Sequence, residues 1–250
     1  MARTRKGYFE HSQSLAVSFV LILPLLAAYE VGMIVFRPPA ASWAGDAIMW
    51  LLNGAFGRGG AIAFNMAVIV AITASLVAMH KMGGVEPATF PLVLGESLVY
   101  GALLTQVLPL FVMYALPLAQ NGGGAPASVA DRMVLSVGAG VYEEIVFRLG
   151  LMSAIYFLAL KATERNWLAV VVAMAASSVL FAACHYLGGF DLSSREFVRS
   201  FSYRTVSGAV FAALYIYRGL AVACYTHAFY DVLVQLSAHL FLWELLSPAR

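Results

Sequence analysis

The chain has 250 residues, of which 62% are hydrophobic and only 11% are charged, and its mean hydropathy is +0.83. This composition excludes an ordinary soluble domain, and a net charge of +2 with scattered basic residues gives no reason to expect a nucleic-acid partner. Several apolar runs reach the roughly 20 residues that cross a bilayer as a helix. We therefore expect an all-α, multi-pass membrane protein whose surface contacts lipid.

Apolar stretches predict about seven membrane spans. In chain order they cover residues 14–36, 61–80, 92–118, 129–160, 166–187, 201–217 and 220–243. The first stretch follows a basic tip and continues without a clear small-residue cleavage site, so we interpret it as a retained helix rather than a signal peptide. Because basic flanks tend to stay on the cytoplasmic side, the tip favours a cytoplasmic N-terminus.

Two segments rich in proline or glycine interrupt the apolar pattern. Residues 37–60 are a connector, and Asn121-Gly-Gly-Gly-Ala-Pro126 is a flexible break. The break divides an N-terminal part, residues 1–120, from a C-terminal part, residues 121–250. All of the intramembrane ionisable pattern lies in the second part. We expect that part to be the catalytic helical core and the first part to be a scaffold or gate.

Three charged residues gather in the fourth expected span. Glu143, Glu144 and Arg148 share about one and a half helical turns, and charges at membrane depth rarely persist without a function or a partner. Glu144 and Arg148 are four residues apart and can form an ion pair. Glu143 points about 100° away from that pair. It suits a general base or acid, and the alternative is a structural hydrogen bond to another helix.

Two histidines in later spans add to this chemistry. His185 follows Phe181 at i,i+4, and His227 precedes Asp231 at the same spacing. An aspartate can accept a proton from one imidazole nitrogen and leave the other nitrogen free, although such a bond can also simply join helices. Two histidines and a carboxylate can activate water directly or hold zinc. Glu143, His185 and His227 would be the metal ligands, and we favour the metal-free version because spacing does not predict their convergence.

The two cysteines allow a second enzyme hypothesis. Cys184 and Cys224 both lie in apolar runs, which argues against a disulfide framework. Cys224 shares a helical face with His227, so a cysteine-dependent sorting enzyme that removes a C-terminal membrane anchor is conceivable. A small apolar core cysteine is the commoner role. A third hypothesis is a non-catalytic membrane scaffold or immunity protein of the same fold.

These residues resemble the motifs of the CPBP family, the CAAX-protease and bacteriocin-processing intramembrane proteases, also called the Abi family. The family pattern is Glu-Glu-x-x-x-Arg, then Phe-x-x-x-His, then His-x-x-x-Asp or Asn. In this chain it reads Glu143-Glu144-Ile-Val-Phe-Arg148, Phe181-Ala-Ala-Cys-His185 and His227-Ala-Phe-Tyr-Asp231. The resemblance covers roughly residues 129–235.

The resemblance implies a helical bundle with a cavity open to the membrane, and an endopeptidase acting on a membrane-associated or lipidated protein or peptide. By that analogy Glu143 and His185 activate water, and Glu144 and Arg148 hold the site together. His227 and residue 231 would stabilise the oxyanion. Asp231 stands where eukaryotic-type CAAX proteases have Asn. Because a carboxylate cannot donate to an oxyanion, we expect Asp231 to orient His227 instead.

Overall fold

The computed structural model confirms the predicted all-α architecture. It describes residues 7–36, 66–78, 86–111, 128–186 and 194–246, with single positions 57, 63 and 80 between them, and no strand occurs among these residues. The glycine-rich break at residues 121–126 lies outside the described residues, as does the expected connector at residues 37–60 apart from position 57.

The described residues of the N-terminal part form four shorter helices and one long helix. Its elements are α1 (Tyr8–Ser12), α2 (Leu15–Leu21), α3 (Leu23–Phe36), the apolar helix Met66–Ala78 and α5 (Thr89–Phe111). The boundary between α2 and α3 lies against the last helix of the chain, where the Tyr225 hydroxyl donates to the Leu21 carbonyl at 2.8 Å. The predicted first span is therefore present, with a local interruption that its hydropathy does not reveal.

The C-terminal part begins with one continuous helical rod that changes its winding. It consists of α6 (Val129–Glu143), the π-helix η2 (Glu144–Met152) and α7 (Ser153–Thr163). A capping box starts it, because the Ser128 side chain accepts from the Asp131 backbone N–H at 3.1 Å and the Asp131 carboxylate accepts from the Ser128 N–H at 2.8 Å. The expected span at 129–160 is thus a longer rod with a π segment at its centre.

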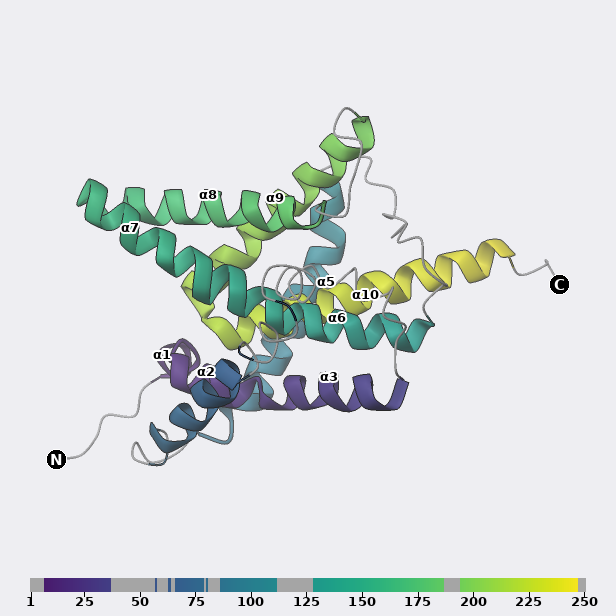
Figure 1. Ribbon diagram of the computed structural model, residues 1–250. Helices are drawn as coiled ribbons and strands as arrows, with labels where there is room; N and C mark the ends of the chain where they lie inside the picture. Colours follow the sequence, from purple (N-terminus) through teal and green to yellow (C-terminus); the bar gives the residue numbers. More distant parts are fainter. Residues whose placement is uncertain are drawn as a thin grey trace.

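Three further helices complete the described part of the chain: α8 (Asn166–Cys184), α9 (Arg195–Arg218) and α10 (Leu220–Leu246). Helix α6 packs against both α3 and α10, and α10 also packs against α5 and α9. Helices α7 and α8 form a hairpin, and α8 lies on α9 (Figure 1). Helix α10 is therefore in contact with both halves of the chain.

Gly140 lets α6 approach α10 closely. A Cβ atom at this position would lie 2.6 Å from the backbone nitrogen of Ala228, which is closer than carbon atoms can approach a backbone. Gly140 precedes Glu143 by less than one turn, and Ala228 directly follows His227. The close contact therefore lies where the candidate site residues of the two helices face each other.

By length and hydropathy, four stretches of the described chain could cross a membrane: Leu15–Phe36, Thr89–Pro109, Val129–Thr163 and Asn166–Cys184. The expected count of about seven is not confirmed. The described helix Met66–Ala78 is shorter than a full span, and both α9 and α10 carry polar side chains inside their sequences. In α10 these include the site residues His227 and Asp231, so the residues that make the site also weaken its hydropathy signal.

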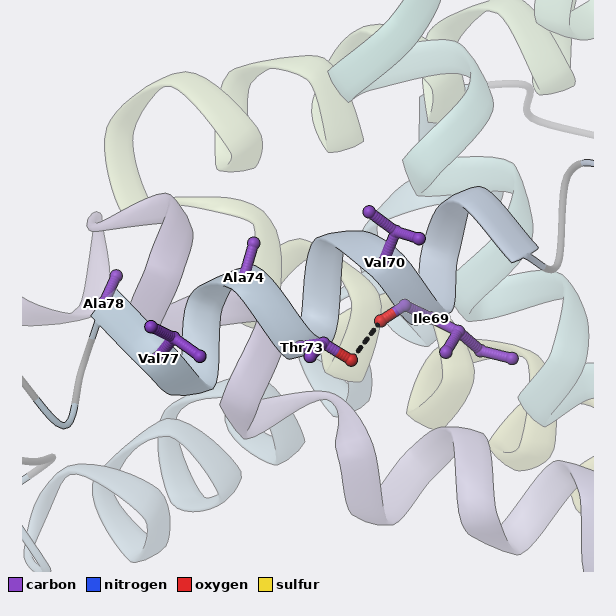
Figure 2. Close-up of a pocket in the computed structure, with 6 residues that line it drawn as sticks. All are labelled: Ile69, Val70, Thr73, Ala74, Val77 and Ala78. Carbon is purple, nitrogen blue, oxygen red and sulfur yellow. Dashed lines mark hydrogen bonds between the residues drawn. The ribbon is translucent and has the colours of Figure 1, made fainter.

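A shallow apolar hollow of about 590 Å³ lies along the helix Met66–Ala78. Figure 2 shows its lining side chains, which all come from this one helix: Ile69, Val70, Thr73, Ala74, Val77 and Ala78. Its polar group, the Thr73 hydroxyl, is satisfied by the Ile69 carbonyl at 2.8 Å. None of the candidate site residues lines it, and its apolar character suits contact with lipid chains rather than catalysis.

Candidate active site

The two adjacent glutamates lie at the junction between α6 and the π-helix. Glu143 is the last residue of α6, and Glu144 is the first residue of η2. Both are buried, and Arg148 within η2 is completely buried as well. A π segment is rare and often marks a functional site, because the wider turn changes the direction in which side chains project. This winding gave no signal in the sequence, where a regular helix was expected.

The predicted i,i+4 pair between Glu144 and Arg148 is present. Arg148 Nε lies 3.2 Å from Glu144 Oε2, although the two groups are not aligned as a hydrogen bond, so the contact is an ion pair held by charge. Arg148 also donates from Nη2 to the Gly208 carbonyl at 3.2 Å, and its guanidinium carbon lies 4.7 Å from the centre of the Phe181 ring. One arginine therefore links η2 to α8 and α9.

His227 on α10 is held by Glu144. Its Nδ1 lies 2.8 Å from Glu144 Oε1, and its ring stacks on Phe211 of α9 with 4.3 Å between the ring centres. Asp231 was expected to orient this ring, but its Oδ2 lies 3.6 Å from the other nitrogen, Nε2. That distance is longer than a hydrogen bond. The ring is therefore oriented by Glu144, with Asp231 near its opposite edge.

His185 sits at the C-terminal end of α8. Its Nδ1 lies 2.8 Å from the Phe181 carbonyl of the preceding turn, and its ring contacts the Phe181 ring edge-on at 4.9 Å between centres. The side chain is 14% exposed, compared with 3% for that of Glu143. Phe181 thus fixes both the position of the ring and its hydrogen-bonding pattern.

The Glu143 carboxylate faces both histidines. Its Oε1 lies 3.7 Å from His185 Nε2, and its Oε2 lies 3.7 Å from His227 Nε2. The structure therefore brings together the six residues singled out in the sequence, from the α6–η2 junction, the end of α8 and the middle of α10. Their catalytic roles stay predictions.

Hydrogen-bond donors and acceptors determine what the two imidazoles present to Glu143. A carbonyl oxygen can only accept, so His185 Nδ1 must be the donor to Phe181, and the Nε2 of the neutral ring carries a lone pair. The same holds for a neutral His227, whose Nδ1 donates to the Glu144 carboxylate. Glu143 and His185 Nε2 are thus two acceptors 3.7 Å apart, and a group with two O–H donors could satisfy both.

Helix α9 supplies site neighbours that the sequence motifs do not contain. Phe211 stacks on His227, and the Gly208 carbonyl accepts from Arg148. Arg204 also lies in this region, with its guanidinium carbon 6.0 Å from the centre of the Tyr186 ring. Nothing local marked Phe211 or Gly208, but an arginine inside an expected span was a signal that could have indicated Arg204.

The predicted metal ligands Glu143, His185 and His227 lie close to one another. In both histidines Nδ1 contacts a protein acceptor and Nε2 faces Glu143, which is also the orientation of a metal-ligating histidine. Among the described residues, no three His, Cys, Asp or Glu side chains are placed so that they could hold an ion together, and a metal at this site stays a prediction. Cys184 and Cys224 are free thiols, and Cys224 is completely buried.

Comparison with known proteins gives one match. Residues 125–233 match the family model described as "Type II CAAX prenyl endopeptidase Rce1-like". No curated protein and no solved structure matches the chain. The matched region contains all three motifs and begins just before α6.

The family match and the apolar helices together indicate an integral membrane protein of the CAAX protease type, working in a membrane on a membrane-associated peptide. The orientation of the N-terminus stays a prediction. In agreement with the resemblance seen in its motifs, residues 125–233 are similar to the Rce1-like family of type II CAAX prenyl endopeptidases.

Proposed function

We propose that the protein is an intramembrane endopeptidase that hydrolyses a peptide bond of a membrane-associated or lipidated protein, using water activated by Glu143 and His185. The observation that carries this proposal is the facing pair of acceptors, Glu143 Oε1 and His185 Nε2, 3.7 Å apart. A direct hydrogen bond between them is too long and lacks a proton in the neutral ring. A water molecule placed beside the gap can donate one O–H to each.

The reaction follows from that placement. The water oxygen attacks the carbonyl carbon of the scissile bond while Glu143 takes one water proton, and the carbonyl π electrons move onto oxygen to form a tetrahedral oxyanion. When the oxyanion re-forms its double bond, the C–N bond breaks. The leaving nitrogen takes the proton held by Glu143. The products are a carboxyl group and an amine, so atoms and charges balance without a covalent enzyme intermediate.

The neighbouring residues position this machinery. Glu144 fixes His227, Arg148 neutralises Glu144, and Phe181 fixes His185. The two contacts of Glu144 are buried and that of His185 is partly buried, so solvent screens them little and water competes poorly for them. No step of the proposed reaction passes through a metal ion.

The cysteine-dependent alternative receives little support from the geometry. The Cys224 side chain is completely buried, and an attacking thiolate would need access to both substrate and base. The nearby His227 already uses Nδ1 to contact Glu144 and turns Nε2 toward Glu143 and Asp231. A purely structural scaffold would not need such a set of buried ionisable groups.

The decisive experiment compares Glu143→Gln with wild type in lipid vesicles, using a quenched fluorescent peptide with a lipid anchor. Loss of a general base typically costs about 10²–10⁴ in rate, and we expect turnover to fall by at least 100-fold while the melting temperature stays unchanged. A matched control is Glu30→Gln, since Glu30 is another carboxylate in an apolar helix and accepts from Tyr142 at 3.2 Å, outside the proposed reaction. Folded Glu143→Gln protein with near-normal turnover would refute the proposal.

A further inference from the structure

Arg204 is a cation next to the candidate active site. It belongs to none of the three sequence motifs and has no role in the proposed water attack. It lies on α9, is half-buried, and its Nε is shielded from solvent without a hydrogen-bond partner among the described residues. Its guanidinium carbon lies 6.0 Å from the ring centre of Tyr186, the residue after His185. A buried guanidinium nitrogen without an acceptor is costly, so this donor is available to a bound group. Arg204 is also near enough to both His185 and Asp231 for its positive charge to act on them.

The turn of α9 that precedes Arg204 is hydrogen-bonded both to the residues just after α8 and to the middle of α10. Four residues before it, the Ser200 hydroxyl accepts from the Tyr186 hydroxyl at 2.5 Å. One residue before it, Tyr203 forms a hydroxyl–hydroxyl hydrogen bond with Tyr230, the neighbour of Asp231. Such anchoring holds the arginine in place before substrate arrives, which is the condition for electrostatic stabilisation of a transition state.

The proposed hydrolysis needs a donor at the oxyanion, and the described site is short of one. Asp231 as a carboxylate cannot donate. Arg148 is engaged with Glu144 and the Gly208 carbonyl. His227 Nδ1 donates to Glu144, and its Nε2 is within 3.7 Å of two carboxylates. Arg148 Nε and Nη1 and Arg204 Nε are all buried without a hydrogen-bond partner among the described residues. Arg148 is already paired with the Glu144 carboxylate, so Arg204 is the cation with an unpaired donor that the site does not otherwise use.

We propose that Arg204 is a catalytic residue that donates to the carbonyl oxygen of the scissile bond as that oxygen becomes the oxyanion, with Asp231 balancing its charge. This inference rests on the proposed hydrolytic function. In the tetrahedral intermediate the carbonyl carbon has gained the water oxygen, and the negative charge on the former carbonyl oxygen is stabilised by the guanidinium. The charge is lost again when the C–N bond breaks, so Arg204 exchanges no proton.

The first test measures kcat and KM separately for Arg204→Gln. Removing one oxyanion donor costs about 10²–10³ in kcat, and we expect a loss of that order with KM within about twofold of wild type. Arg195→Gln is the matched control, because Arg195 is an exposed arginine on the same helix, and it should leave both constants unchanged. A large rise in KM with unchanged kcat would instead indicate recognition of an anionic substrate group and overturn the proposal.

A second test separates donation from simple neutralisation of Asp231. Asp231→Asn supplies an amide donor, whereas Asp231→Leu removes the charge without supplying one. We expect Asp231→Asn to recover at least tenfold of the kcat lost in Arg204→Gln, and Asp231→Leu to recover none. Equal recovery by both would show that Arg204 only neutralises Asp231, which would overturn the proposal.

A third measurement protects the test against a folding failure of Arg204→Gln. A phosphinic peptide carries the charge and shape of the tetrahedral intermediate. Its affinity for Arg204→Gln should fall, relative to wild type, at least tenfold more than the affinity of the substrate falls. Arg204→Lys replaces Arg204→Gln in this measurement if only the lysine variant folds. Equal weakening of both ligands would contradict donation to the oxyanion. An active Glu143→Gln protein would refute the hydrolytic mechanism itself. An inactive Glu143→Gln protein together with a fully active Arg204→Gln protein would refute only the role of Arg204.

Discussion

Glu144 is the residue that joins the site together, because its two carboxylate oxygens have different partners. Oε1 accepts from His227 on α10, and Oε2 faces Arg148 one turn along its own helix. The pairing with Arg148 could be predicted from the i,i+4 spacing. The bond to His227 could not, since it joins residues 83 positions apart and depends on how two helices pack.

Arg148→Ala should therefore damage both stability and activity. It leaves the Glu144 carboxylate buried without its cation, and breaking a buried pair costs about 3–5 kcal/mol. We expect a clearly lower melting temperature in detergent, together with loss of cleavage because Glu144 no longer holds His227 in one orientation. A variant that melts with the wild type would show that the pair contributes nothing.

Replacing both cysteines should have a small effect. Cys224 is fully buried and Cys184 is half-buried, and neither takes part in the proposed water attack. We expect the Cys184→Ala/Cys224→Ala protein to keep activity within about threefold of wild type, with a minor stability loss from the void at Cys224. Cleavage and melting are measured on the same preparation, before and after a thiol alkylator. A folded but inactive double variant would favour the cysteine-dependent enzyme.

At the scale of helices, the positions of the motifs were predictable and the geometry between them was not. Hydropathy indicated the helices that carry Glu143, His185 and His227, because each motif sits in a long apolar run. The π segment and the contribution of α9 were missed, since winding and helix packing depend on long-range contacts that local spacing does not encode. Arg204 shows this limit well: its charge is visible in the sequence, but its neighbours are not.

The contact between α6 and α10 can be tested at Gly140. A Cβ there would lie 2.6 Å from the Ala228 backbone, so Gly140→Ala must push α6 away from α10. Overpacking of this kind typically costs about 1–3 kcal/mol, and it would also separate Glu143 from His227. We expect a lower melting temperature and a drop in kcat.

The matched control for that change is Gly95→Ala on α5. Nothing lies within 4 Å of a Cβ added at Gly95, and alanine is the better helix former by about 1 kcal/mol. Gly95→Ala should therefore melt at or above the wild-type temperature and cleave normally. If the two variants behaved alike, the close approach of α6 and α10 would not be a requirement of the site.

At the scale of the whole molecule, the N-terminal helices contact the helix that carries the candidate site residue His227. Arg218 at the end of α9 contacts Glu96 of α5 through Nε at 2.5 Å and Nη2 at 2.6 Å, and it lies over the ring of Phe9 in α1. The Tyr8 hydroxyl donates to the same carboxylate at 2.6 Å. Burial, and then this bond to Glu96, raise the pKa of the Tyr8 phenol, so it remains a neutral donor.

This cluster sits directly before the start of α10. Gly219, the residue after Arg218, has φ +89, a conformation that favours glycine, and a Cβ there would lie 2.8 Å from the Ser12 carbonyl oxygen. The division at residues 121–126 was predicted from composition and lies outside the described residues. Around Arg218 and Gly219, helices from both parts pack directly against each other. This contact favours a scaffold role for the first part.

A double-mutant cycle on Glu96 and Arg218 tests that scaffold role. Each single change to glutamine leaves one charge of a largely buried bidentate pair without its partner, so each should lower the free energy of unfolding. The double variant should be destabilised by less than the sum of the singles, with a coupling energy of about 0.5–3 kcal/mol. Because no contact between this cluster and the candidate site occurs in the part of the chain that the structure describes, kcat per folded molecule should stay close to wild type below the melting transition. Additive single effects would show that the pair does not join the two parts, and a large loss of kcat in well-folded protein would point to a gate instead of a scaffold.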